Sequence, residues 1–182
     1  MATILDQLHT DHINVVKLLE LFERELEVLK RSDSEPNYFK WQNILLYMTT
    51  YQDVFHHPAE EKVFAYLCID DPEVSQAVKE VESQHEILYQ KSERLQGLLM
   101  DVETNTITID KSDLHIACKD YIHQLQKHMS LEEAIIFPYA KKQLQKSDLD
   151  DLDKSINKIN DPLFGLIKRA EFSELYQCIC EQ

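Results

Sequence analysis

The sequence predicts an all-α fold, an up-down-up-down four-helix bundle with one or two extra short C-terminal helices. Three observations lead to this prediction. Apolar residues recur at helical spacing almost throughout the 182 residues. Two glycines and five prolines are too few for a sheet-rich fold with many tight turns. Turn signals divide the chain into four long segments, and short connections between long helices favour antiparallel neighbours.

The first two helices are expected over residues 3–30 and 37–69, with a turn over 31–36 between them. Thr3 and Asp6 resemble a capping pair at the start of the first helix. These two helices should therefore lie side by side and antiparallel.

The third and fourth helices are expected over residues 72–100 and 111–144. The pair Asp71-Pro72 is a strong start signal, because an acidic N-cap precedes a proline at the first helical position. Residues 103–109 break the helical pattern, and we expect a loop there because no partner strand is visible.

The tail is expected to add short helices to the bundle. Ser147 and Asp150 resemble a capping box that opens one helix, and Asp161-Pro162 should start the last one. We therefore expect residues 1–146 to form the bundle and residues 147–182 to form a helical extension packed on the same domain, with a homo-oligomer contact as another use of the tail.

Charge and composition limit the partners and the location. The formal net charge of −14 argues against nucleic acid and against an anionic membrane surface. No stretch approaches the ~20 apolar residues that span a bilayer. We expect a cytoplasmic protein whose four cysteines, Cys68, Cys118, Cys178 and Cys180, are reduced.

A histidine followed four and five residues later by glutamates occurs twice in the chain. The two copies begin at His56 and at His128. On a helix, a residue and its fourth neighbour point in nearly the same direction, so each copy offers an imidazole and a carboxylate together. Two such pairs in one bundle suggest a single site for two metal ions.

Two further histidines should lie at the same depth of the bundle. The midpoints between His12 and His56, between His56 and His85, and between His85 and His128 all fall in expected turns. Residues equally far from a turn meet at one level when the chain folds back. The predicted ligands are His12, His56, Glu60, His85, His128 and Glu132.

Helix direction separates some of the remaining candidates. We prefer His56 with Glu60, but His57 with Glu61 keeps the same spacing and stays as an alternative. His115 and His123 lie about 140° from His128 around their helix and should face solvent. His9 lies one turn before His12 and could hydrogen-bond a ligand from outside. Tyr121 shares the side of His128 and has the same potential role.

The donor types favour particular metals. Four nitrogens and two carboxylates suit iron or manganese better than calcium, which prefers oxygen alone. A structural zinc would use one sulfur-rich set of four ligands, although zinc could substitute here. Carboxylates can bridge two ions, and six protein ligands leave coordination positions open for a small diatomic molecule.

The chain resembles the hemerythrin-like, HHE cation-binding family. The resemblance spans roughly residues 3–145. It rests on four motifs: Leu8-His-Thr-Asp-His12-Ile-Asn14, Phe55-His-His-Pro-Ala-Glu-Glu61, Glu82-Ser-Gln-His85-Glu86 and His128-Met-Ser-Leu-Glu-Glu-Ala-Ile-Ile-Phe-Pro138. It implies a non-haem, carboxylate-bridged di-iron centre held by the ligands named above. Glu133 is the reserve for Glu132, because oxygen carriers place that acid five residues after the histidine.

Tyr89 stands where oxygen carriers have a second histidine on the third helix. The ligand set is therefore more similar to members linked to nitric-oxide stress and iron handling. Tyr89 could hydrogen-bond a bound ligand, approach the metal or fill space. We expect binding or sensing of oxygen or nitric oxide, with an unknown redox partner. The alternatives are an oxidoreductase that reduces nitric oxide or peroxide, iron storage or delivery, and a metal-gated interaction module.

Overall fold

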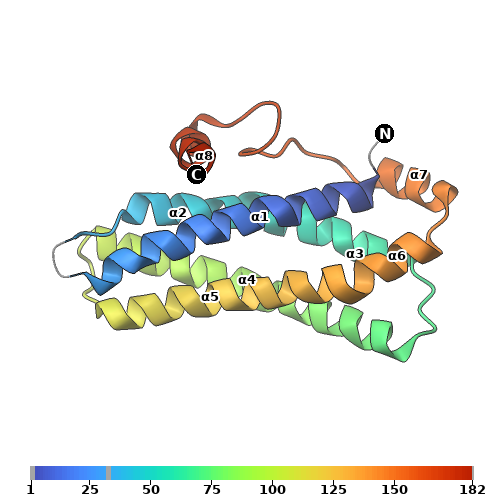
Figure 1. Cartoon of the computed structure of the whole chain (residues 1–182), viewed down its shortest axis with the longest axis horizontal. Helices are drawn as coiled ribbons and strands as arrows, with labels where there is room; N and C mark the ends of the chain where they lie inside the picture. The colour runs from blue at the N-terminus through green and yellow to red at the C-terminus, as the bar shows by residue number, and fades with distance from the viewer. Residues whose placement is uncertain (1–2, 32–33, 182) are drawn as a thin grey trace.

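The computed structural model describes residues 3–31 and 34–181, and these form an all-α bundle, as the sequence predicts (Figure 1). Four long rods lie side by side and antiparallel, and two short helices of the tail lie outside them. No strand occurs in the described ranges. The core is continuous along the rods, from Leu5 and Leu8 through Phe22 to Trp41 and Leu99.

The first and third rods match their expected starts. The first consists of α1 (Ile4–Leu26) and the short 3₁₀ helix η1 (Glu27–Lys30). Thr3 caps α1, since its hydroxyl accepts from the backbone N–H of Asp6 and its own N–H donates to the Asp6 carboxylate. The third rod is α4 (Pro72–Glu103), and the carboxylate of Asp71 accepts from the N–H of Glu73.

The second and fourth rods are not the continuous α-helices that we expected. The second consists of α2 (Tyr38–Tyr47), a π-helix η2 (Met48–His56) and α3 (His57–Tyr66). The fourth consists of α5 (Lys111–Leu131), a π-helix η3 (Glu132–Ile136) and α6 (Phe137–Gln143). Residues 104–110 connect the third and fourth rods without a strand.

Each π-helix ends two residues before a proline, and this position explains it. Proline has no N–H to donate, and its ring clashes with the carbonyl four residues earlier in a regular helix. Pro58 is the second residue after η2, and Pro138 is the second residue after η3. The N–H groups of His57 and Phe137 donate five residues back, to the carbonyls of Gln52 and Glu132. The rod thus widens by one residue where a kink would otherwise form.

The first tail helix begins slightly earlier than expected. It is α7 (Lys146–Ser155), and Gln145 rather than Ser147 precedes it as the cap. The N–H of Gln145 donates to the carboxylate of Asp148. The side chain of Leu152 then packs fully buried against the bundle.

The prediction that Asp161-Pro162 starts the last helix is wrong. The Asp161 carboxylate accepts from the N–H groups of Leu163 and Phe164 and from the hydroxyl of Tyr47, which closes a turn instead. Gly165 fits there because a Cβ would lie only 2.4 Å from the Asp161 carbonyl oxygen. The last helix is α8 (Ser173–Cys180), after the 3₁₀ turn η4 (Ala170–Phe172).

The length and hydropathy of the helices bear on the expectation that no segment spans a membrane. Among the helices in residues 3–31 and 34–181, none is both long enough and apolar enough to cross a bilayer.

Candidate metal centre

Donor atoms from all four rods converge at one level of the bundle. His12 comes from α1, His56 from the end of η2, and His57 and Glu60 from α3. His85 comes from α4, His128 from α5 and Glu132 from η3. All seven side chains are buried, and Glu60, His128 and Glu132 are fully buried. The fold therefore brings together the six predicted residues and adds one of the reserve candidates, His57.

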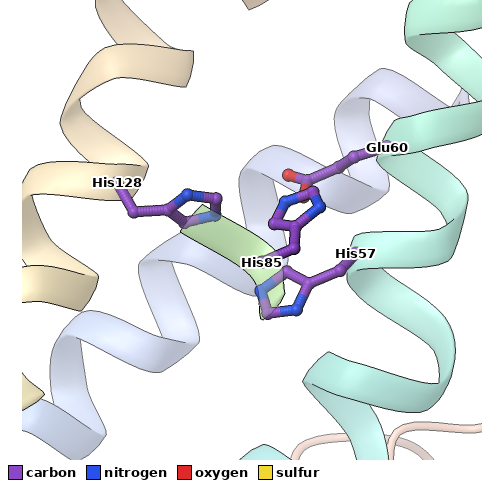
Figure 2. Close-up of side chains that lie close together, drawn as sticks. All are labelled: His57, Glu60, His85 and His128. Carbon is purple, nitrogen blue, oxygen red and sulfur yellow. The ribbon is translucent and has the colours of Figure 1, made fainter. Parts of the chain in front are cut away.

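Two overlapping groups of potential ligands form this cluster. One contains His12, His56 and Glu60, and the other contains His57, Glu60, His85 and His128. Within each group, one donor atom per residue lies within 4.8 Å of every other. Figure 2 shows the second group, with His57 and Glu60 on one helix and His85 and His128 approaching from two others.

Glu60 lies between the two groups. Its Oε1 atom is 3.0 Å from His56 Nε2 and 3.5 Å from His12 Nε2. Its Oε2 atom is 3.4 Å from His85 Nε2. The two oxygens of one carboxylate thus face different histidine sets, which is the position that a bridging ligand requires.

Glu132 also reaches both groups. Its Oε2 atom is 3.3 Å from His12 Nε2 and 3.3 Å from His128 Nε2. Glu133 takes a different position: its side chain is 34% exposed and lies on the outer side of His12. Among the two adjacent acids, Glu132 is therefore the one that faces the interior.

Side chains that surround the cluster hydrogen-bond to all five imidazoles, in each case at the Nδ1 atom. Each Nδ1 atom lies 2.8–3.3 Å from a side-chain oxygen. The pairs are His12 with Glu133, His56 with Asp11, His57 with Asp53, His85 with Glu61, and His128 with Gln84. An N–H at Nδ1 leaves the Nε2 lone pair free, which is how metal-binding histidines are commonly held.

Sequence reasoning missed three of these outer partners, namely Asp11, Asp53 and Gln84. Asp11 and Gln84 each directly precede a candidate histidine, and Asp53 lies four residues before His57. The last spacing was a usable signal, because residues four apart on a helix share a face. The others depended on helix rotation, which the sequence alone leaves open.

The remaining candidates lie outside the cluster. His9 donates toward Glu133, with its Nδ1 2.9 Å from Oε1. Tyr89 is 39% exposed, and hydrogen bonding to Glu93 raises the pKa of its hydroxyl. Tyr121 is buried, and burial raises the pKa of its hydroxyl. His123 is exposed as predicted, whereas His115 is half-buried.

The buried polar atoms fit a cation. Although imidazole nitrogens lie 3.0–3.5 Å away, within the described part of the chain both oxygens of Glu60 and of Glu132 and Nε2 of His85 and of His128 make no hydrogen bond of acceptable geometry. A buried carboxylate without a partner is strongly destabilising, whereas a metal ion compensates it. The described cysteines do not join either group, so the donors are nitrogen and oxygen alone.

Electrostatics of the metal-free cluster show how tightly its charges interact. Burial acts to lower the pKa of His12, but the carboxylates of Glu132 and Glu133 outweigh it and raise that pKa to about 12. Burial and the negative charge of Glu60 raise the pKa of Glu132 to about 7. Without metal, protons therefore occupy positions that a cation would take.

Comparison with protein families gives one finding. The model of the hemerythrin HHE cation-binding domain matches residues 3–140. Neither the comparison with curated proteins nor the comparison with solved structures gave a match. The matched range covers the four rods and all seven residues of the cluster, and the chain belongs to the hemerythrin HHE cation-binding family.

Proposed function

We propose that this protein holds two iron ions in the cluster and binds or senses oxygen or nitric oxide there. The observation that carries the proposal is the position of Glu60, with one oxygen facing His12 and His56 and the other facing His85. Nitrogen and carboxylate donors suit iron, and a bound iron pair would supply reversible binding of a diatomic molecule. Manganese or zinc could occupy the same donors.

The two proposed metal positions differ in their protein donors. His12 and His56 would hold one ion, and His57, His85 and His128 would hold the other, with Glu60 and Glu132 shared. The first position has fewer nitrogens, so open coordination positions are expected mainly there. His57 would thus serve as a fifth nitrogen ligand, from a helix other than the one where oxygen carriers have theirs.

An apolar approach to the first position favours an uncharged ligand. A groove of about 300 Å³ between α1 and α5 is lined by His9, His12, Ile13, Val16, Gln126, Met129, Ser130 and Glu133. Its floor includes His12, whose ring stacks on Phe137 at 5.3 Å. Apolar walls admit oxygen or nitric oxide and disfavour charged reductants.

Metal analysis and visible spectroscopy test this function. The purified protein, reconstituted anaerobically with Fe(II), should hold about two ions per chain. Its visible spectrum should change on exposure to oxygen or nitric oxide and reverse when the gas is removed. A protein that binds no transition metal, or that binds iron without a spectral response to either gas, contradicts the proposal.

Sustained turnover distinguishes the alternative functions. A di-iron oxidoreductase would consume many equivalents of nitric oxide or peroxide with an added reductant, whereas a binding protein takes up a stoichiometric amount. Storage would instead require far more than two ions per chain. Matching melting temperatures of the metal-free and metal-loaded protein would exclude a metal-gated interaction module.

A further inference from the structure

A second cavity reaches the cluster from the opposite seam of the bundle. It has a volume of about 230 Å³ and is lined by Asp53, His57, Pro58, Glu61, Glu82, His85, Glu86 and Tyr89. Its floor consists of His57 and His85, whose rings stack at 4.4 Å. Four of the lining residues are acidic, and none of those that the structure describes there is a lysine or an arginine. We call these four acids, Asp53, Glu61, Glu82 and Glu86, the acidic mouth.

Helical spacing in two rods builds the acidic mouth. Asp53, His57 and Glu61 follow one another at intervals of four residues, across the junction of η2 and α3. On α4, Glu82 and Glu86 are also four residues apart, and His85 lies between them in the sequence. Residues three or four apart share one helix face, so each rod presents acids beside a buried histidine.

Asp53 supplies the observation that points to a cation. Its side chain is only 10% exposed, and its Oδ1 lies 3.1 Å from Nδ1 of His57. Its Oδ2 is buried and has no hydrogen-bond partner among the described residues. A buried carboxylate oxygen in this state favours a positive ligand, and the described lining residues include no lysine or arginine to provide one.

We propose that the acidic mouth is a transient binding site through which a divalent metal cation reaches the centre. Carboxylates clustered at a cleft raise the local concentration of cations and speed association by 10- to 1000-fold. The apolar groove between α1 and α5 lacks this feature, because Glu133 is its single acid among the described residues. Cations and neutral ligands would then approach the same cluster through different seams.

The inference rests on the metal-binding part of the proposed function and not on the gas ligand. Glu82 and Glu86 are exposed and are not among the proposed ligands. Their removal should therefore slow the arrival of the metal without changing how much is bound at equilibrium. A slower rate of metal loading with an unchanged amount of bound metal distinguishes residues of a transit site from metal ligands.

Stopped-flow mixing of metal-free protein with Co(II) measures the arrival directly, since cobalt bound to nitrogen and oxygen ligands absorbs visible light. The test variant is Glu82→Gln/Glu86→Gln. The matched control is Glu20→Gln/Asp150→Asn, which removes the same charge at exposed positions outside the cavity. We expect about tenfold slower loading in the test variant and wild-type loading in the control.

Salt gives an independent readout of the same proposal. Between about 20 mM and about 200 mM salt, loading of the wild type should slow much more than loading of the test variant, because screening weakens attraction that the variant lacks. Equal final cobalt content and equal spectra in all three proteins are part of the expected result.

Two results would overturn the transit site while leaving the centre intact. One is loading of the test variant at the wild-type rate. The other is a lower cobalt content of that variant at equilibrium, which would make Glu82 or Glu86 a ligand or a structural residue. A wild type that takes up no cobalt at all would instead refute the metal centre itself, and the loading route with it.

Discussion

Asp11 and His56 form a fully buried pair, with Oδ2 of Asp11 3.1 Å from Nδ1 of His56. Asp11 is itself held by Gln7, whose amide donates to Oδ1 at 2.7 Å, and by the hydroxyl of Tyr51. This chain of contacts fixes the ring of His56 with Nε2 toward Glu60. A residue that touches neither proposed metal position thereby controls the direction of one ligand.

Replacing Asp11 with asparagine should weaken metal binding without abolishing it. The amide oxygen can still accept from His56, but it lacks the charge that strengthens the imidazole as a ligand. We expect a 10- to 100-fold loss of affinity, the usual effect of changing such an outer partner. Competition with a chelator measures the affinity. Asp6→Asn, which alters an exposed cap on the same helix, is the control, and equal affinities in the two variants would contradict the assignment.

The adjacent residues Glu60 and Glu61 provide a test variant and a matched control for the proposed bridging role of Glu60. Glu60 is fully buried between the two groups, whereas Glu61 is 54% exposed and contacts the outer side of His85. Glu60→Gln replaces one inward oxygen with an amide nitrogen that cannot bind metal, so both positions should lose iron. Glu61→Gln keeps an acceptor for His85, and the charge that it removes is 54% exposed and screened by solvent, unlike that of Asp11, so this variant should hold wild-type iron at saturating metal. Mass spectrometry of bound metal decides between them, and full occupancy in Glu60→Gln would refute bridging.

The role of His57 is testable by stoichiometry. His57→Ala removes one nitrogen from the second group and none from the first, so bound iron should fall from about two ions per chain to about one. His123→Ala changes an exposed histidine on α5 and should leave the iron content unaltered. If His57→Ala retains all its iron and its spectrum, His57 is a packing residue.

Removal of the metal should change how stability depends on pH. Burial alone would lower the pKa of His56, but the charge of Glu60 and the bond to Asp11 raise it to about 9, and His12 reaches about 12. A histidine with a raised folded-state pKa stabilises the protein fully below its unfolded pKa of about 6.5 and loses this contribution as pH rises. Burial lowers the pKa of His57 and of His128 in the folded protein. These two histidines therefore destabilise the folded state at acidic pH, and this effect ends near about pH 7.5, above which both are neutral in the folded and the unfolded state.

Between about pH 7.5 and about pH 9.5, the metal-free protein should therefore become less stable. Each retained proton contributes a slope of up to about 1.4 kcal/mol per pH unit. The metal-loaded protein has no such protons to lose at these histidines, and metal binding itself strengthens as pH rises. Denaturant unfolding of both forms at several pH values measures the difference. Parallel pH profiles would show that His12 and His56 carry no protons in the metal-free state.

Much of the architecture could be predicted because it depends on local signals. The caps at Thr3 and Asp71 and the apolar spacing act within a few residues of each helix end, so the presence of four helical rods was predicted correctly, although two of them contain π-helices that were not expected. The same signal failed at Asp161, because Tyr47, which lies 114 positions earlier in the chain, contributes to the turn there. A dipeptide cannot reveal a contact with a distant rod.

The inward position of His57 escaped the helical-wheel argument for a geometric reason. Each rod of a four-helix bundle has two neighbours, in directions roughly 90° apart, and successive helical residues differ by about 100°. His56 can therefore face α1 while His57 faces α4, and both rings point into the interior. The helical-wheel argument assigns one inward direction to each rod, whereas the second rod contributes histidines in two inward directions.

The π-helix before Pro58 has a genetic consequence. A five-residue turn differs from a regular one by a single amino acid, so loss of one codon within 48–55 would restore ordinary helical winding ahead of His56. The residues upstream would then keep nearly their present direction relative to His56, His57 and Glu60, because the π-turn already absorbs the roughly 100° that one extra residue adds. A three-nucleotide deletion there should therefore leave the metal donors aligned, whereas the same deletion in the regular turns of α2 should rotate everything before it by about 100°.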